Sequence, residues 1–332
     1  MVKTELLSGT EALGNGVLAC KADLIDFPLK FSSEVADCVR KTGSVQGVAS
    51  RFSLASAAMA NISMGRRTFL AYENDSKKLA EMRMPVVIAN LYGCGLRVRD
   101  NGCLLFTPET NQDIIDSVIQ LYRVCEDPKV LLPGIINIDS PDLMEPVIVP
   151  TEQAVNKFLS PLKVSRLDVK NPLSIIYDAD PKAQQDAMEN ALNLIENLGE
   201  KWKKAFKRDF NLAEKYHTDD AELVIVISGS QASTGKVVVD QLRSQGKKVG
   251  ILGMKVIRPW PAEFVADAIG EKKVGVIDQD VSIGANGILY SEVKSCFDGF
   301  CSGFIVKRRL QEKDFVDIFD RLEKNEEERL WL

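Results

Sequence analysis

The chain has 332 residues and a formal net charge of −5, and its 45% hydrophobic and 27% charged residues are ordinary for a soluble protein. One hydrophobic core seldom serves a chain of this length, so two domains are expected. The acidic balance argues against a sequence-independent nucleic-acid binder, which needs a basic face for phosphates. No apolar run reaches the roughly 18 residues of a membrane span, and no secretory signal pattern is seen. We therefore expect a cytoplasmic protein without nucleic-acid or membrane partners.

The cysteines and the single histidine limit the metal chemistry that this chain can support. Its seven cysteines are scattered and odd in number, and they form no C-x-x-C pair, so we interpret them as reduced thiols, mostly in the core. His217 is the only histidine, which excludes a multi-histidine metal site. We predict that no metal ion is bound by this chain.

The first 150 residues alternate apolar runs with amphipathic segments, as in an α/β domain with a parallel sheet. Ser32 and Ser33 are candidate helix caps, and Glu34 falls where a first-turn carboxylate is favoured. Strands are predicted within residues 22–27, 66–73, 84–93 and 129–139, and helices within 31–41, 52–65 and 111–128.

The second half of the chain begins with a change of composition. Prolines recur through residues 141–181, which we interpret as a connector, and one long helical pattern follows over 182–217. Three further strands are predicted within 223–228, 248–256 and 273–280, separated by helices. We place the domain boundary at residue 219, which gives two α/β domains with parallel sheets, 1–219 and 220–332.

The segment SGSQASTGK, residues 228–236, follows a predicted strand and leads into a helix, the context of a phosphate-binding P-loop. A P-loop requires G-x-x-x-x-G-K-[ST], in which the hydroxyl reaches Mg²⁺. Five residues rather than four separate Gly229 from Gly235, and Val237 stands in place of the hydroxyl. We interpret the segment as an ordinary strand-to-helix turn and keep a nucleotide-binding α/β protein as an alternative.

Motifs spread over the chain carry a family resemblance. They are a G-S-x-x-x-T turn, an x-R-P-x-P segment, a D-x-x-x-x-x-G segment and two first-domain segments: Gly229, Ser230 and Thr234; Val256, Arg258, Pro259 and Pro261; Asp278 and Gly284; residues 65–69 and 126–139. In this order, over nearly its whole length, the chain resembles the α subunit of pyruvate and other 2-oxoacid:ferredoxin oxidoreductases.

The resemblance implies a fold, a reaction and partners. The first domain would have the pyrimidine-type thiamine-diphosphate-binding fold and the second a transketolase C-terminal-like fold. The complex would decarboxylate a 2-oxoacid such as pyruvate oxidatively to acyl-CoA, or run the reverse, with ferredoxin and coenzyme A as reaction partners. Subunits of the β, γ and δ types would complete it. Thiamine diphosphate would be shared with the β subunit, which would hold the Mg²⁺, and iron–sulfur clusters would lie only in partner subunits.

The resemblance also places candidate site residues, and there this sequence departs from the family. FPLKFSSE, residues 27–34, matches Y-P-I-T-P-S-S-E, so Pro28, Ser33 and Glu34 would contact the cofactor, and Lys30 replaces the threonine near the substrate. Arg51 stands where the family has a glutamate that hydrogen-bonds the aminopyrimidine, and residues 43–59 contain no acid.

Two further family features also change in this chain. A T-x-T-S-S-Q-G turn is shortened within residues 70–78, and Arg97 or Arg99 would have to replace an arginine that has shifted in register. Two interpretations stay open. The chain is a working α subunit whose Lys30, Arg51, Arg97 and Arg99 form a cationic patch for an anionic substrate, or it is a catalytically degenerate scaffold subunit. Four changes in one pocket favour the second interpretation.

Overall fold

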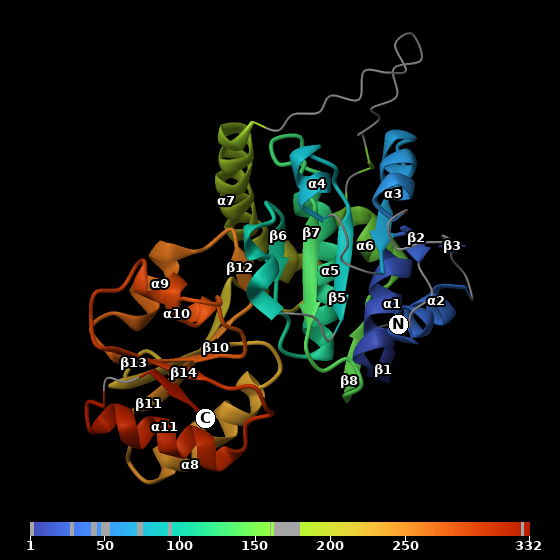
Figure 1. Ribbon diagram of the computed structural model, residues 1–332. Helices are drawn as coiled ribbons and strands as arrows, with labels where there is room; N and C mark the ends of the chain where they lie inside the picture. The colour runs from blue at the N-terminus through green and yellow to red at the C-terminus, as the bar shows by residue number, and fades with distance from the viewer. Residues whose placement is uncertain are drawn as a thin grey trace. The chain divides into compact units, whose positions relative to one another are not determined.

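A computed structural model of the chain describes residues 3–26, 30–40, 45–47, 54–71, 76–91, 95–159, 161–162, 180–326 and 329–332 (Figure 1). Contacts between residues divide it into two compact units, Met1–Gly93 with Arg99–Phe210, and Cys94–Val98 with Asn211–Leu332. The sequence-based boundary at residue 219, with domains 1–219 and 220–332, stays a prediction.

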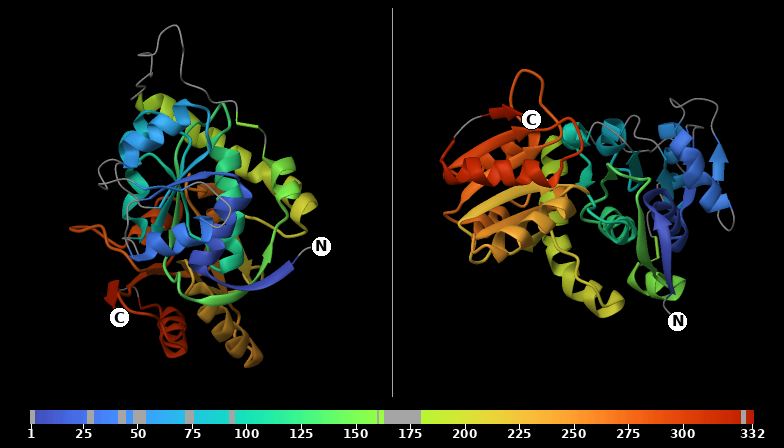
Figure 2. Two further views of the ribbon diagram at one scale, coloured as in Figure 1. Left: turned by 90° about the vertical axis from the view of Figure 1, so that its right-hand side faces the viewer. Right: turned by 90° about the horizontal axis from the view of Figure 1, so that it is seen from below.

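The first unit is built on a parallel sheet with the strand order β6-β7-β5-β4-β2-β3. The bounds of these strands are β2 Asp23–Asp26, β3 Val45–Gly47, β4 Thr68–Leu70, β5 Val87–Leu91, β6 Leu104–Phe106 and β7 Gly134–Ile138. The four strands predicted here are confirmed, as β2, β4, β5 and β7. The left view of Figure 2 shows helices on both sides of these strands, which is how a parallel sheet buries both of its faces.

The helices of this unit are α1 Gly9–Ala19, α2 Lys30–Arg40, α3 Leu54–Ser63, α4 Ser76–Glu81, α5 Asn111–Cys125, α6 Glu152–Phe158 and α7 Pro181–Phe206. Helix α5 is predicted from its apolar periodicity, and it begins with a capping box between Thr110 and Asp113. It is buried along nearly its whole length, and it packs against α1, α7 and the strands β5, β6 and β7. It is the central helix of the unit.

Helix α1 was not predicted, and its glycines are the reason. Gly14 and Gly16 weaken the helical pattern, because glycine costs roughly 1 kcal/mol in a helix interior. The structure shows what they provide: a Cβ at Gly14 would lie 2.7 Å from the Cys38 side chain of α2, and one at Gly16 3.1 Å from Val118 of α5. Close packing of α1 against α2 and α5 therefore requires Gly14 and Gly16, the same glycines that weaken the helical pattern in the sequence.

The structure differs from the sequence-based expectation at the start of α2 and within the expected connector. Helix α2 begins at Lys30, so Ser32 and Ser33 lie inside it rather than at its cap, and Glu34 lies beyond its first turn. The expected connector contains strand β8, Met144–Val149, which pairs antiparallel with β1, Lys3–Ser8, and also contains α6. Local composition conceals β8, because its pairing partner lies near the other end of the unit in sequence.

The end of α7 also differs from the prediction over 182–217. The helix stops at Phe206, and Lys207 adopts a left-handed conformation with φ 59°. Arg208 then turns back onto α5, where its Nε and Nη2 donate to the two carboxylate oxygens of Asp116 at 2.9 and 2.5 Å. Burial raises the pKa of Asp116, and the guanidinium opposes that shift. A long-range ion pair, which periodicity cannot reveal, fixes the end of this helix.

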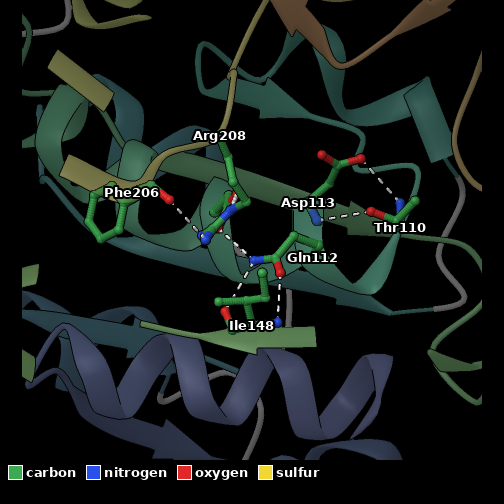
Figure 3. A network of polar contacts seen from close by, with 7 residues as sticks. Thr110, Gln112, Asp113, Ile148, Phe206 and Arg208 are labelled. Carbon is green, nitrogen blue, oxygen red and sulfur yellow. Dashed lines mark hydrogen bonds and ion pairs between the residues drawn. The ribbon is translucent and has the colours of Figure 1, made fainter. Parts of the chain in front are cut away.

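Gln112 extends this contact to the ribbon of β1 and β8 (Figure 3). Its amide nitrogen donates to Asp116 at 3.0 Å, and its amide oxygen accepts from the backbone of Ile148 in β8 at 2.8 Å. A two-stranded ribbon is marginal by itself, so a direct link to the central helix stabilises it.

The second unit has a mixed sheet with the order β15-β14-β13-β10-β11-β9. Its elements are β9 Ala213–Tyr216, β10 Leu223–Ser228, α8 Ala232–Ser244, β11 Val249–Met254, β12 Val256–Arg258, α9 Ala262–Ile269, β13 Lys273–Asp278, α10 Ile288–Lys294, β14 Cys301–Ile305, α11 Glu312–Glu323 and β15 Arg329–Trp331. The three predicted strands are confirmed as β10, β11 and β13. The predicted α/β fold with parallel strands is confirmed for this unit, and one added strand, β9, runs antiparallel to β11. Figure 1 shows α8 and α11 on one face of the sheet and α9 and α10 on the other.

The D-x-x-x-x-x-G motif of the second unit fixes the start of α10. Asp278 ends β13, and its carboxylate accepts from the backbone of Leu289 at 2.6 Å and of Tyr290 at 3.0 Å. A Cβ on Gly287 would lie 1.9 Å from the same carboxylate, so only glycine fits there. Burial raises the pKa of Asp278 to about 7, although the two backbone donors oppose the shift.

Removing the carboxylate of Asp116 should be costly. In Asp116→Ala the guanidinium of Arg208 stays partly buried without its partner, so we expect a loss of about 3–5 kcal/mol in unfolding free energy, measured by denaturant titration. The matched control is Asp209→Ala, which breaks an ion pair to Lys203 whose side chains are 62% and 63% exposed. It should cost far less, because solvent screens an exposed ion pair. Equal losses in both variants would contradict the importance of the pair.

Asp278 should make stability depend on pH. In the unfolded chain an aspartate ionises near pH ~3.9, and here the folded pKa is about 7. The folded protein therefore binds an extra proton between these values, so this residue's contribution falls as pH rises from about 4 to 7. We expect the unfolding free energy of the unaltered chain, minus that of Asp278→Asn, to fall by at most about 1.4 kcal/mol per pH unit. A difference that is constant with pH would contradict the burial of an ionisable group.

Candidate functional site

The predicted site segments converge on one edge of the first sheet. FPLK begins where β2 ends, residues 48–53 follow β3, residues 72–75 follow β4, and residues 92–94 follow β5. These four strands are adjacent and parallel, so their carboxyl ends meet at the same edge of the sheet. The topology therefore gathers the four places where this sequence departs from the family pattern.

The strand order also marks one position along this edge. From β2 the chain crosses to β3 on one side, and from there it returns to β4 on the other side of β2. In open parallel sheets, ligands bind outside the carboxyl ends of the strands at the point where the order reverses. That point lies at the carboxyl end of β2, from which the chain continues into Phe27, Pro28 and the start of α2.

The described backbone covers three of the five predicted site residues. Lys30 is the first residue of α2, and Ser33 and Glu34 follow within the same helix. Pro28 and Arg51 lie outside the described residues, so their predicted roles are carried into the proposal below. Helix α2 directly follows the switch-point strand, and its N-terminus provides backbone N–H groups and a positive dipole end that favour an anion.

A buried carboxylate at the same edge, Glu109, could replace the family's glutamate only if it lay close to the switch point. Glu109 follows β6 and is 6% exposed. Neighbouring strands lie about 4.8 Å apart, and β6 is four positions from β2, so roughly 19 Å separate the two strands. Glu109 therefore cannot replace the missing glutamate, because the matching residue, Arg51, follows β3 in the chain, and β3 lies one strand beyond β2.

A buried polar pair at this edge was missed by sequence reasoning. Asn90 in β5 and Asn137 in β7 are register partners one residue before the ends of their strands. The Asn90 amide donates to the Asn137 oxygen at 2.8 Å, and the residues are 6% and 9% exposed. Asparagine is uncommon in central parallel strands, and two such residues in neighbouring apolar runs are the signal that could have revealed the pair. It provides polar groups next to the β5 end of the edge.

In the second unit the Gly-Lys pair of the opening turn has a structural role. A Cβ on Gly235 would lie 2.4 Å from Ile251 and 2.6 Å from Phe315, so the glycine lets α8 approach the sheet and α11. Lys236 is 16% exposed at its side chain and forms an ion pair with Glu214 of β9 at 2.8 Å. This geometry argues against the nucleotide-binding alternative, because Lys236 already pairs with Glu214 of the sheet.

The arginine of the proline motif is likewise held by its own unit. Arg258 donates to Glu292 of α10 at 2.7 Å and to the Ile257 carbonyl at 2.9 Å. Both charged side chains are largely buried, 18% and 14% exposed. The motif therefore ties β12 to α10.

Arg97 and Arg99, two members of the expected cationic patch, fall into different units. Arg97 belongs to the second unit, where its Nε lies 3.7 Å from Asp280, and Lys307 lies 3.4 Å from the same carboxylate. The backbone of Leu96 also donates to Asp280, at 2.9 Å. Arg99 belongs to the first unit and lies 3.5 Å from Asp100. Arg97 therefore already has a carboxylate partner inside the second unit, which it shares with Lys307.

Two searches of the described residues concern metal binding and membrane insertion. No group of three or more His, Cys, Asp or Glu side chains that could hold a metal ion occurs among the described residues. None of the described helices is both long enough and apolar enough to cross a membrane.

Comparisons with known proteins agree with this geometry. The family described as pyruvate:ferredoxin oxidoreductase core domain II matches residues 221–310. The pyruvate synthase subunit PorA of Methanothermobacter thermautotrophicus is 29% identical, over 99% of this chain and 97% of its own length. PorA of Pyrococcus horikoshii is 33% identical over 75% of this chain and 71% of its own length.

A solved structure supports the fold. The 2-oxoglutarate:ferredoxin oxidoreductase of Magnetococcus marinus superimposes with a TM-score of 0.70 at 13% identity, covering 98% of this chain and 65% of that chain. Such a low identity shows the fold alone, while the PorA relatives show the family. The chain belongs to the PorA family and is an α subunit of a 2-oxoacid:ferredoxin oxidoreductase.

Proposed function

We propose that this chain forms the pyrimidine side of a thiamine diphosphate site at the carboxyl edge of its first sheet. The observation that carries the proposal is the β2–α2 junction, which leads from the switch point of a parallel sheet into Pro28 and Lys30. The complex would convert a 2-oxoacid such as pyruvate oxidatively to acyl-CoA, or run the reverse, and exchange electrons with ferredoxin. When bound, thiamine diphosphate supplies the carbanion chemistry that carbon–carbon cleavage needs.

Partner subunits would supply the remaining groups. The sequence has a single histidine and no C-x-x-C pair, which supports placing the iron–sulfur clusters in other chains. A β-type subunit would hold the diphosphate and its Mg²⁺, and γ- and δ-type subunits would complete the complex, with coenzyme A as the acyl acceptor. Within this chain, Pro28, Ser33 and Glu34 would contact the cofactor.

Lys30 and Arg51 would act on the substrate. A 2-oxoacid carries a carboxylate, and an ammonium or guanidinium group binds a carboxylate through charge-assisted hydrogen bonds. Lys30 stands at the N-terminus of an 11-residue helix, whose dipole adds to the attraction for an anion. Together these charges would hold the carboxylate while the carbonyl carbon faces the cofactor.

The alternative is that the chain is a catalytically degenerate scaffold of the same complex. It is favoured by Arg51 at the family's glutamate position, because a guanidinium has no lone pair to accept a hydrogen bond from the aminopyrimidine. Under this alternative, the chain keeps the fold and the subunit interfaces and does not activate the cofactor.

Lys30→Ala tests the substrate role. In the purified native complex we expect the KM for the 2-oxoacid to rise about tenfold or more with a smaller change in kcat, because the interaction binds ground state and transition state alike. The assay is 2-oxoacid-dependent reduction of ferredoxin in the presence of coenzyme A. The control is Lys77→Ala, at an exposed position of α4. An unchanged KM in Lys30→Ala would contradict the role.

Deuterium exchange at the reactive thiazolium carbon separates the two candidate functions. If the site works, we expect the thiazolium proton to exchange at the catalytic rate in the unaltered chain, with Arg51 in place. If the site is degenerate, we expect slow exchange that becomes faster in the double variant Lys30→Thr/Arg51→Glu. Isolation of the native protein as a free monomer would contradict both. ATP with Mg²⁺ protecting residues 229–236 in hydrogen exchange would instead support a nucleotide-binding protein.

A further inference from the structure

A pocket of about 490 Å³ opens in the first unit among α5, α6 and α7. This volume lies within the range of small-molecule sites. None of these three helices carries a residue predicted for the thiamine site. The pocket is therefore a separate feature of the unit, and its lining indicates what it would bind.

Four cationic side chains line the pocket, Arg123 of α5, Lys157 of α6, and Lys201 and Lys204 of α7. Arg123 lies 3.7 Å from Asp127, and Lys204 lies 4.0 Å from Glu200. The Lys204–Glu200 pair is exposed and contributes little, whereas the side chains of Arg123 and Asp127 are 22% and 21% exposed, so the charge of Arg123 is partly offset. In a protein with a net charge of −5, this concentration of positive charge favours an anion.

The rest of the lining is apolar and rigidly supported. Leu198 is 1% exposed, and the ring of Phe158 lies edge-on against Trp202 with centroids 5.2 Å apart. Phe206 lies 5.6 Å from the same ring in a similar geometry. Aromatic contacts of this kind hold Phe158 in place, so it offers a preorganised surface for a planar group.

Unused polar groups lie in the helices around the pocket. Asp116, Gln120 and Arg123 are spaced three or four residues apart and lie on one face of α5. Asp116 contacts Arg208, which follows α7, so this face of α5 is turned toward α7. Gln120 is 1% exposed, and among the described residues neither atom of its amide has a hydrogen-bond partner. The same holds for Nε1 of Trp202, which is 0% exposed. Buried polar groups are normally paired, so Gln120 and Trp202 are exceptions in the helices around the pocket, although neither residue lines it.

We propose that this pocket binds a small organic anion that carries a planar aromatic group. The anionic group would contact the four cations at the rim, and the ring would pack on Phe158 and Leu198. Neither half of the lining suffices alone, because the lysines are solvated and the apolar surface is small. Recognition therefore requires charge and ring in one molecule.

The test is a calorimetric titration of the full chain in its native complex. The probes are adenosine monophosphate and 1-anilinonaphthalene-8-sulfonate as ring-bearing anions, adenosine as a ring alone and inorganic phosphate as an anion alone. We expect at least one ring-bearing anion to bind at least tenfold more tightly than adenosine and phosphate. Preference for adenosine monophosphate assigns a nucleotide, and preference for the sulfonate assigns another aromatic anion.

Charge-matched variants locate the binding. Lys157→Gln/Lys201→Gln removes two lining charges, and we expect it to weaken binding at least tenfold. The control, Lys182→Gln/Lys203→Gln, changes the net charge equally at two exposed lysines of α7 that do not line the pocket. Equal losses in both double variants, or no loss in the first, would overturn the proposal, and so would failure of both ring-bearing anions to bind.

A second variant tests occupancy of the pocket without altering its charge. Ala205 is an exposed lining residue, and Ala205→Trp would place a bulky side chain in the opening. We expect binding to be lost while the unfolding midpoint stays close to that of the unaltered chain. Retained affinity in Ala205→Trp would show that the probe binds elsewhere and would overturn the proposal.

Discussion

The buried contact between Arg208 and Asp116 is the constraint on which the first unit depends. Two charges are removed from water there, and a bidentate geometry with distances of 2.9 and 2.5 Å offsets that cost. The contact ends α7 and anchors it to α5, and through Gln112 it reaches the ribbon of β1 and β8. The same contact joins α5 to the end of α7, two of the three helices that line the pocket.

Polar residues near the predicted motifs and sites are placed differently in the two units. In the second unit the motif residues that drew attention in the sequence are committed to architecture: Asp278 fixes the start of α10, Arg258 pairs with Glu292, and Lys236 pairs with Glu214. In the first unit the carboxyl edge of the sheet presents polar groups near strand ends, such as the pair of Asn90 and Asn137. The division agrees with a family whose relatives are named as subunits of pyruvate synthase.

The departure from the family pattern is concentrated at the switch point of the first sheet. Lys30 begins α2 directly after the switch-point strand, so replacing a threonine there changes the charge at the position where a parallel sheet binds its ligand. The cationic pocket on α5, α6 and α7 is built from residues outside every family motif noted in the sequence.

Local sequence patterns were enough to predict the buried strands and the central helix. β5, β7, β10, β11 and β13 are mostly apolar and largely buried, and α5 has a strong apolar periodicity with a capping box, so local pattern and burial agree. The family resemblance, carried by collinear motifs, indicated the α subunit. Only the tertiary structure revealed α1, whose Gly14 and Gly16 serve close packing, and the antiparallel β9. It also assigned Arg97 to the second unit and brought Arg123, Lys157 and Lys201 to one pocket, because these contacts join residues far apart in the chain and leave no periodic signal.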